Sequence, residues 1–198
     1  MATAPAALPF VDDHLWRMSV ERYHEAIRAG VLTGDDRVEL LEGVLVEKMS
    51  KYPRHSFVCD ALSDCILLLR LTGWYRRSEQ PLTLADSEPE PDLALVRGSR
   101  ADYLTRHPGP GETGLVVEVA DSTLSRDRGK KRRIYARAGI PCYWLVNLNA
   151  RTLEVYTSPA GDDYEKVTIL TEGESVTLEL DGQACGQIAL RDILPPIA

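Results

Sequence analysis

The sequence predicts a mixed α/β (α+β) fold in which a central mixed β-sheet is flanked by helices. Three observations predict it: helical and strand-like segments follow each other irregularly, 44% of the residues are hydrophobic, and 198 residues suffice to bury one core. The irregular order differs from the β–α alternation of a doubly wound fold. We expect a single domain over residues 19–198, preceded by a partly flexible N-terminal extension, residues 1–18.

Two helices are expected in the first half of the chain. Ser19 can cap a helix over residues 19–29, which Gly30 ends. A longer helix is expected over residues 54–71, because apolar residues recur there at helical spacing. Its expected core face consists of Phe57, Ala61, Cys65, Leu68 and Leu69.

Strands dominate the rest of the pattern. Residues 37–48 are strand-like around a central Glu42-Gly43 pair, which predicts a hairpin. Residues 114–120 form a nearly continuous apolar run, typical of a strand that is covered on both faces. A polar surface loop is expected over residues 97–113 and a third helix over residues 127–138. Further strands are expected over residues 74–84, 92–96, 142–147 and 152–156, with two more short ones after Tyr164.

The composition limits the classes of partner and of metal site. The chain has 23 basic and 30 acidic residues and a formal net charge of −7, which excludes a uniformly basic nucleic-acid coat but not a local basic patch. No two cysteines have C-x-x-C spacing, so a structural zinc site is not expected. We expect free thiols in a reducing cytoplasm. The cysteines are Cys59, Cys65, Cys142 and Cys185.

No segment has the pattern of a signal peptide or a membrane span. Residues 1–9 are rich in alanine and proline without an early basic residue, and Asp12 and Asp13 interrupt any apolar run. The longest apolar stretch, residues 65–71, contains Arg70 and is too short to cross a bilayer. We therefore expect a cytoplasmic protein without a membrane partner.

Glu118 is the most informative single residue. It stands between Val117 and Val119 in an apolar strand, where an unpaired ionised carboxylate costs several kcal/mol. Strand alternation places Glu118 on the same face as Val116 and Ala120. Either a metal ion holds this carboxylate, or it is a strand-end glutamate that bonds an arginine.

Asp92 opens a second apolar strand directly after Pro91. An aspartate after proline is common at turns, so Asp92 alone carries little information. Two strand carboxylates that approach each other need a positive charge between them. Magnesium suits such a pair, because it takes one or two carboxylates and keeps several waters.

Lys131 is the lysine of the third helix that is expected to face the sheet. It shares the core-facing stripe with Ile134, Tyr135 and Ala138, whereas Lys130, Arg133 and Arg137 lie on the outer side. An inward lysine can orient a water or offset charge on a phosphate under attack. The alternative is a lysine whose stem merely covers apolar surface.

Other polar residues allow both a functional and a structural interpretation. Glu39 or Glu42 is a candidate further metal ligand or part of a solvated strand face. His55 could contact phosphate, or it could have only a local role at the start of its helix. A basic cluster near Lys131 could bind a phosphodiester backbone or remain a solvated face. Its expected nucleic-acid contacts are Arg126, Arg128 and Lys130.

The pattern resembles the PD-(D/E)xK nuclease superfamily, and more closely its Uma-two family of restriction endonucleases. Pro91-Asp92, Glu118 and a lysine shifted onto the next helix carry the resemblance. It covers roughly residues 19–156, and the run from Leu115 to Val146 is its most specific part. The matching stretches are residues 39–43, His55, and residues 91–96, 115–123, 127–131 and 135–146.

The resemblance implies a restriction-endonuclease-like fold with magnesium or manganese as cofactor. Asp92, Glu118 and Lys131 would be the catalytic residues. The ordinary superfamily motif has its lysine two residues after the glutamate, where this chain has Ala120, so a shift to Lys131 is required. The implied metal ligands are Glu39, Asp92, Glu118 and the backbone carbonyl of Val119.

Two hypotheses for function follow. The first is a magnesium-dependent endonuclease that hydrolyses DNA phosphodiester bonds with a metal-activated water, and acts as a homodimer if it cuts both strands. The second is a non-catalytic nucleic-acid-binding or assembly module, which the net charge of −7 favours. No organic cofactor is expected, because the chain has neither a phosphate-binding loop nor a dinucleotide glycine fingerprint.

Overall fold

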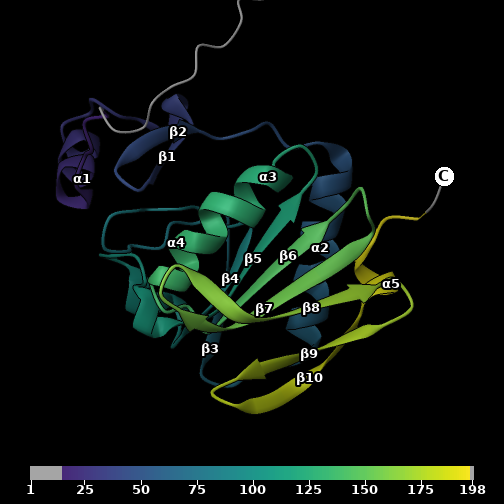
Figure 1. Cartoon of the computed structure of the whole chain (residues 1–198). Coiled ribbons are helices and arrows are strands. Elements are labelled where there is room, and N and C mark those ends of the chain that lie inside the picture. The colour runs from purple at the N-terminus through teal and green to yellow at the C-terminus, as the bar shows by residue number, and fades with distance from the viewer. Residues whose placement is uncertain (1–14, 197–198) are drawn as a thin grey trace, which may run out of the picture.

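The computed structural model describes residues 15–196, and most of the expected extension, residues 1–18, lies outside this range. Within it, a central sheet has the strand order β3-β4-β5-β6-β7-β8, and two further sheets each pair two strands, β1 with β2 and β9 with β10 (Figure 1). Neighbouring strands of the central sheet are antiparallel except for β5 and β6, which are parallel. The expectation of a mixed sheet is therefore confirmed.

The bounds of the strands follow the predicted segments most closely in the centre of the sheet. The predicted strand over residues 74–84 is shorter in the structure, since the chain leaves the sheet at Glu79, which has a positive φ of 53°. The central strands are β3 (Trp74–Ser78), β4 (Leu93–Arg97), β5 (Thr113–Ala120), β6 (Cys142–Asn147), β7 (Thr152–Ala160) and β8 (Asp163–Thr171).

Helices cover both faces of the central sheet, and β5 is buried along its whole length. Leu115, Val117 and Val119 face the side on which α2 packs, whereas Val116 and Ala120 face α4. This alternation confirms a strand covered on both faces. The helices are α1 (Val20–Arg28), α2 (Pro53–Leu68), α3 (Leu124–Arg126), α4 (Arg132–Arg137) and α5 (Leu190–Ile193).

The predicted third helix starts earlier than expected and changes its pitch. It runs from α3 through a π-helical turn, Asp127–Lys131, into α4. Such π turns are rare and often occur at functional sites. The loop over residues 97–113 contains two short 3₁₀ turns, Arg100–Tyr103 and Pro110–Glu112.

The core face predicted for the second helix was correct in part, since Ala61, Cys65 and Leu69 are partly buried and pack against the core. Phe57 is 45% and Leu68 is 81% exposed, whereas Val58, Leu62 and Ile66 are buried against the sheet. Both sets have helical spacing and both are apolar, so periodicity alone does not distinguish them. The packing partners of α2 decide which set is buried.

The hairpin is confirmed as β1 (Val38–Leu41) and β2 (Val44–Glu47). Its turn residues Glu42 and Gly43 have φ values of 52° and 75°, as the tightest two-residue hairpin turns require. With α1 it forms a unit at one end of the molecule, where Val20, Tyr23 and Leu40 pack together (Figure 1).

The segment after residue 160 contains three strands, where two were expected. The pair β9 (Ser175–Leu180) and β10 (Gln183–Ala189) follows β8 and adds apolar side chains to the core on the α2 side. The expected strand count was too low because β8 and β9 are separated only by a short turn. Among the described residues, no helix has the length and apolar character needed to cross a membrane.

Candidate functional site

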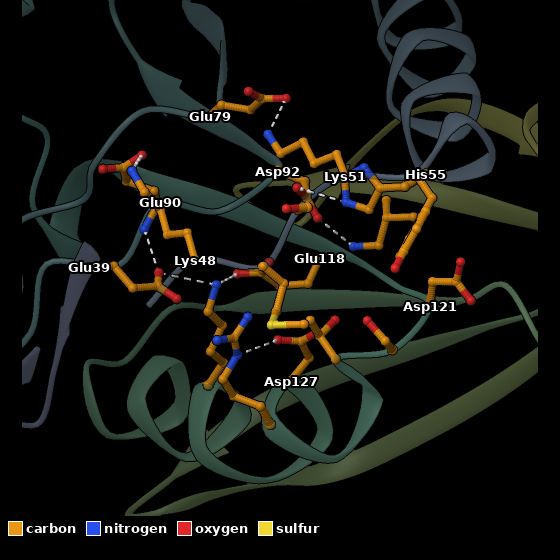
Figure 2. Close-up of a pocket in the computed structure, with 18 of the residues that line it drawn as sticks. Glu39, Lys48, Lys51, His55, Glu79, Glu90, Asp92, Glu118, Asp121 and Asp127 are labelled. Atoms are coloured by element: carbon orange, nitrogen blue, oxygen red, sulfur yellow. Dashed lines mark hydrogen bonds and ion pairs between the residues drawn. The ribbon is translucent and has the colours of Figure 1, made fainter. Parts of the chain in front are cut away.

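A cleft with a volume of about 470 Å³ opens where the carboxyl end of β5 meets α2, the hairpin and the π-helical turn. Glu39 comes from β1, and Asp92 stands one residue before β4. Glu118 and Val119 belong to β5, and Lys131 is the last residue of the π-helical turn. These residues all line the cleft, and Figure 2 shows the carboxylates of Glu39, Asp92 and Glu118 gathered around its centre.

Glu118 is bonded by two side chains from the helix that follows β5. The Nζ atom of Lys131 donates to Oε1 of Glu118 at 2.9 Å, and the Tyr135 hydroxyl donates to the same oxygen at 2.6 Å. Both ion-pair partners are almost fully buried. The strand alternation and the helical stripe therefore bring Glu118 and Lys131 together from 13 residues apart in the sequence.

The pKa values of Glu118 and Lys131 both lie above their usual values, so both side chains keep their protons to a higher pH. Burial raises the pKa of Glu118 to about 8, although the charge of Lys131 acts in the opposite direction. Burial lowers the pKa of Lys131, but the charges of Glu118, Glu39 and Asp127 outweigh it and leave the pKa above its usual value. A cation that enters the cleft must therefore compete with protons for these carboxylates.

Both oxygens of the Asp92 carboxylate are held by other groups. His55 Nε2 lies 3.1 Å from Oδ1, and the backbone N–H of Val119 donates to Oδ2 at 2.8 Å. Burial raises the pKa of Asp92, but the hydrogen bonds from His55 and from the Val119 amide outweigh burial, so the pKa lies below its usual value. Asp92 is thus an ionised carboxylate in a fixed orientation.

His55 is held in turn by Cys59, one turn further along α2. The Cys59 sulfur lies 3.6 Å from Nδ1 of His55, and burial raises the pKa of this thiol well above its usual value. The thiol therefore stays protonated and donates to Nδ1, which leaves the hydrogen on Nε2 for Asp92. The three side chains form one directed chain of hydrogen bonds.

Among residues 15–196, only His55, Cys59 and Asp92 form a group of three possible metal ligands whose atoms all lie within 4.8 Å of one another. Asp92 contacts Nε2 of the imidazole and Cys59 contacts Nδ1. One ion cannot bind both nitrogens of one ring, because their lone pairs point in different directions. A hydrogen-bonded chain therefore accounts for this group better than a shared metal ion does.

The structure separates the two hairpin glutamates that the sequence left as alternatives. Glu39 is buried, its Oε2 atom lies 3.3 Å from Lys131 Nζ, and it accepts the N–H of Glu90 at 3.1 Å. Glu42 lies outside the cleft and pairs with Arg133, whose hydrogen bond holds the pKa of Glu42 below its usual value.

Asp127 is a cleft residue that the sequence interpretation did not single out. It is buried and lines the cleft, and its Oδ1 atom, 3.9 Å from Arg126 Nε, has no hydrogen-bond partner among residues 15–196. Burial raises its pKa, and the charge of Lys131 opposes this. Its position four residues before Lys131 on the same helix was the available signal, because such residues share a face.

The three basic residues expected to contact nucleic acid occupy different places. Arg126 lines the cleft and donates from Nη1 to the carbonyl of Glu47 at 3.1 Å. Arg128 makes two hydrogen bonds to the buried carboxylate of Glu154, outside the cleft. Lys130 does not line the cleft either.

Comparisons with known proteins identify a family and a similar fold. The model of the Uma2 family, described as "Putative restriction endonuclease", matches residues 20–187. The fold is similar to the crystal structure of a "putative nuclease belonging to DUF820" from Anabaena variabilis, with a TM-score of 0.60 and 14% sequence identity over 84% of this chain and 94% of that chain. A search of the curated proteins found no match.

Proposed function

This chain belongs to the Uma2 family, and we propose that it is a divalent-metal-dependent endonuclease that hydrolyses phosphodiester bonds in DNA. One observation carries the proposal: Lys131 donates to the buried carboxylate of Glu118 inside a cleft that also contains Asp92. Buried charges of this kind are costly to fold and are enriched at functional sites, which supports a chemical role for the pair.

The cleft carboxylates suit a magnesium or manganese ion by their chemistry, and because no three of them bring oxygens within 4.8 Å of one another in the described residues, waters would complete its coordination. Glu39, Asp92, Glu118 and Asp127 supply carboxylates to its floor, and Lys131 supplies a single positive charge. Hard oxygen donors with excess negative charge are the ligands that these ions prefer. We expect the ion to be held by Asp92, Glu118 and the backbone carbonyl of Val119, with Glu39 as a further ligand. A bound ion would polarise a water and neutralise charge on the phosphate.

The side chains have separate tasks in this proposal. Lys131 brings a permanent positive charge to the floor of the cleft, where it offsets the charge that develops on the non-bridging phosphate oxygens. Asp92 is kept ionised and oriented by His55 and by the Val119 amide. As a water adds to phosphorus and the bond to the leaving oxygen breaks, these fixed groups need little rearrangement.

A plasmid-nicking assay in magnesium tests the proposal. We expect nicking by the native protein and none by Asp92→Asn, Glu118→Gln or Lys131→Met, each confirmed as folded by circular dichroism. Equal nicking by native protein and variants would reveal a contaminating nuclease and leave the proposal without support.

The net charge of −7 favours one alternative, a non-catalytic module that keeps the fold. Isothermal titration calorimetry with magnesium separates the two functions. The endonuclease requires that the native protein binds the ion and that Glu118→Gln loses affinity. No binding by either protein favours the module.

A further inference from the structure

We propose that the loop of residues 48–52, which joins β2 to α2, is the substrate-binding wall of the cleft and prefers a single nucleic-acid strand with an unpaired base. This inference rests on the proposed function for the class of ligand. It assigns recognition to a segment outside the basic cluster that follows β5, where the sequence placed all three expected contacts, Arg126, Arg128 and Lys130. The loop consists of Lys48, Met49, Ser50, Lys51 and Tyr52.

The loop forms one continuous part of the cleft lining. All five of its residues line the cleft, whose floor carries Asp92 and Glu118. Arg126 also lines the cleft and donates to the Glu47 carbonyl, at the start of the loop. The loop and Arg126 therefore lie next to each other and bring three basic side chains to one part of the cleft lining.

The loop supplies two lysines at a spacing suited to a phosphodiester backbone. Lys48 and Lys51 are three residues apart, so an extended backbone separates them by about 10 Å at most. Neighbouring phosphates of one strand fall within such a span. Both side chains line the cleft, and Figure 2 shows their ammonium groups at its edge, where Lys48 meets Glu90 and Lys51 meets Glu79.

The ion pairs of these lysines can be exchanged for phosphates. Lys48 Nζ lies 2.9 Å from Glu90, and Lys51 Nζ lies 2.5 Å from Glu79. The Glu79 side chain is about half exposed, so it can swing into solvent. The Lys51–Glu79 pair is solvent-exposed, and such pairs contribute little to stability, whereas the Lys48–Glu90 pair is half-buried. A polyanion that offers several phosphates at once can displace both carboxylates.

Exposed apolar side chains beside the lysines complete the surface. Tyr52 is 56% and Met49 is 51% exposed. Tyr52 stands at the N-cap position of α2, but its side chain makes no capping hydrogen bond, so helix stability does not explain the residue. Positive charge next to an exposed aromatic ring is the pattern of single-strand binding, because a free base can stack on the ring. A base inside a duplex is already stacked and offers no open face.

Arg128 and Lys130 do not offer an equivalent surface. The guanidinium of Arg128 is engaged by the buried carboxylate of Glu154, and neither residue lines the cleft. A strand bound along that side would hold its phosphates away from Asp92 and Glu118. The loop is therefore the basic segment whose position matches the proposed chemistry.

Fluorescence anisotropy with a labelled single-stranded DNA oligonucleotide, and with its duplex, tests the proposal in EDTA, where cleavage is blocked. We expect the native protein to bind the single strand more tightly than the duplex. Lys48→Ala combined with Lys51→Ala should weaken binding roughly tenfold or more and reduce the salt dependence by about 0.7 per lysine. Lys166→Ala, which removes an exposed lysine of β8, is the matched control and should bind like the native protein.

Tyr52 is tested separately, because its role is stacking and not charge. Tyr52→Ala should lose roughly tenfold in affinity for the single strand, and Tyr52→Trp should retain it. Neither change should alter the salt dependence. The duplex affinity of Tyr52→Ala should stay close to that of the native protein.

The outcomes distinguish this inference from the proposed function. If the native protein nicks plasmid DNA but the double lysine variant binds like Lys166→Ala, the loop is not the binding wall. If the loop variants lose binding while the native protein never nicks DNA, the binding wall stands and the endonuclease proposal fails. A native protein that binds neither single strand nor duplex overturns both, and tighter duplex binding overturns the preference for an unpaired base.

Discussion

His55 Nε2 lies 3.1 Å from Oδ1 of Asp92, and this contact joins the start of α2 to the residue that precedes β4. The same carboxylate accepts the N–H of Val119 through its other oxygen. Asp92 therefore enters any metal complex with its orientation already fixed from two sides. Groups behind a ligand commonly change metal affinity by 10–100-fold when they are removed.

We expect His55→Ala to weaken magnesium binding and nicking by about 10–100-fold each. The physical reason is that Asp92 loses its orienting donor. His55→Gln should recover part of both, because its amide can donate from a position near Nε2. Calorimetry and the nicking assay measure the two effects. A variant with unchanged magnesium affinity but weaker DNA binding would show that His55 contacts phosphate instead.

Substitutions of Cys59 test whether His55, Cys59 and Asp92 are held together by hydrogen bonds or by a shared metal ion. The hydrogen-bond interpretation predicts that Cys59→Ser keeps nicking activity near the native level, since a hydroxyl also donates to Nδ1. Cys59→Ala should show a smaller loss than His55→Ala. A zinc titration tests the metal interpretation. Zinc affinity that disappears in Cys59→Ala but persists in Cys65→Ala would contradict the hydrogen-bond interpretation and establish a metal site at His55, Cys59 and Asp92.

Lys131 and Glu118 are expected to depend on each other for stability. Above pH 8, where Glu118 is ionised, Lys131→Ala leaves a buried carboxylate without its cation, which should cost about 3–5 kcal/mol in the free energy of unfolding. Lys131→Met combined with Glu118→Gln removes both charges and should recover most of this loss. Urea denaturation of the variants, compared with the native protein, gives the values. A double variant no more stable than Lys131→Ala would contradict the coupling.

Magnesium binding should depend on pH through Glu118. Its pKa is raised from 4.5 to about 8, so below pH 8 the metal-free site holds a proton that the ion must displace. Affinity should therefore rise with pH by up to about tenfold per unit and level off above pH 8. Calorimetry at pH 7 in buffers of different ionisation enthalpy should detect proton release in the native protein. Glu118→Gln should release none, and equal release by both proteins would assign the proton to another group.

Local patterns in the sequence determined the elements that carry the candidate site. The apolar run of β5 identified a strand covered on both faces, and the polar residue inside it is the buried Glu118. The helical stripe identified Lys131 as the inward lysine of its helix. The Glu42-Gly43 pair located the hairpin turn. These predictions succeed because alternation, helical spacing and turn chemistry depend on neighbouring residues only.

Only the tertiary structure decided which segments meet. It selected Val58 and its partners as the buried face of α2, brought Glu39 and not Glu42 to the cleft, and placed His55 against Asp92. Each of these outcomes joins residues that are distant in the sequence, through packing and strand pairing that no local period encodes. The proposed role of Lys48 and Lys51 also depends on the tertiary structure, because only the folded chain places these lysines in the lining of the cleft.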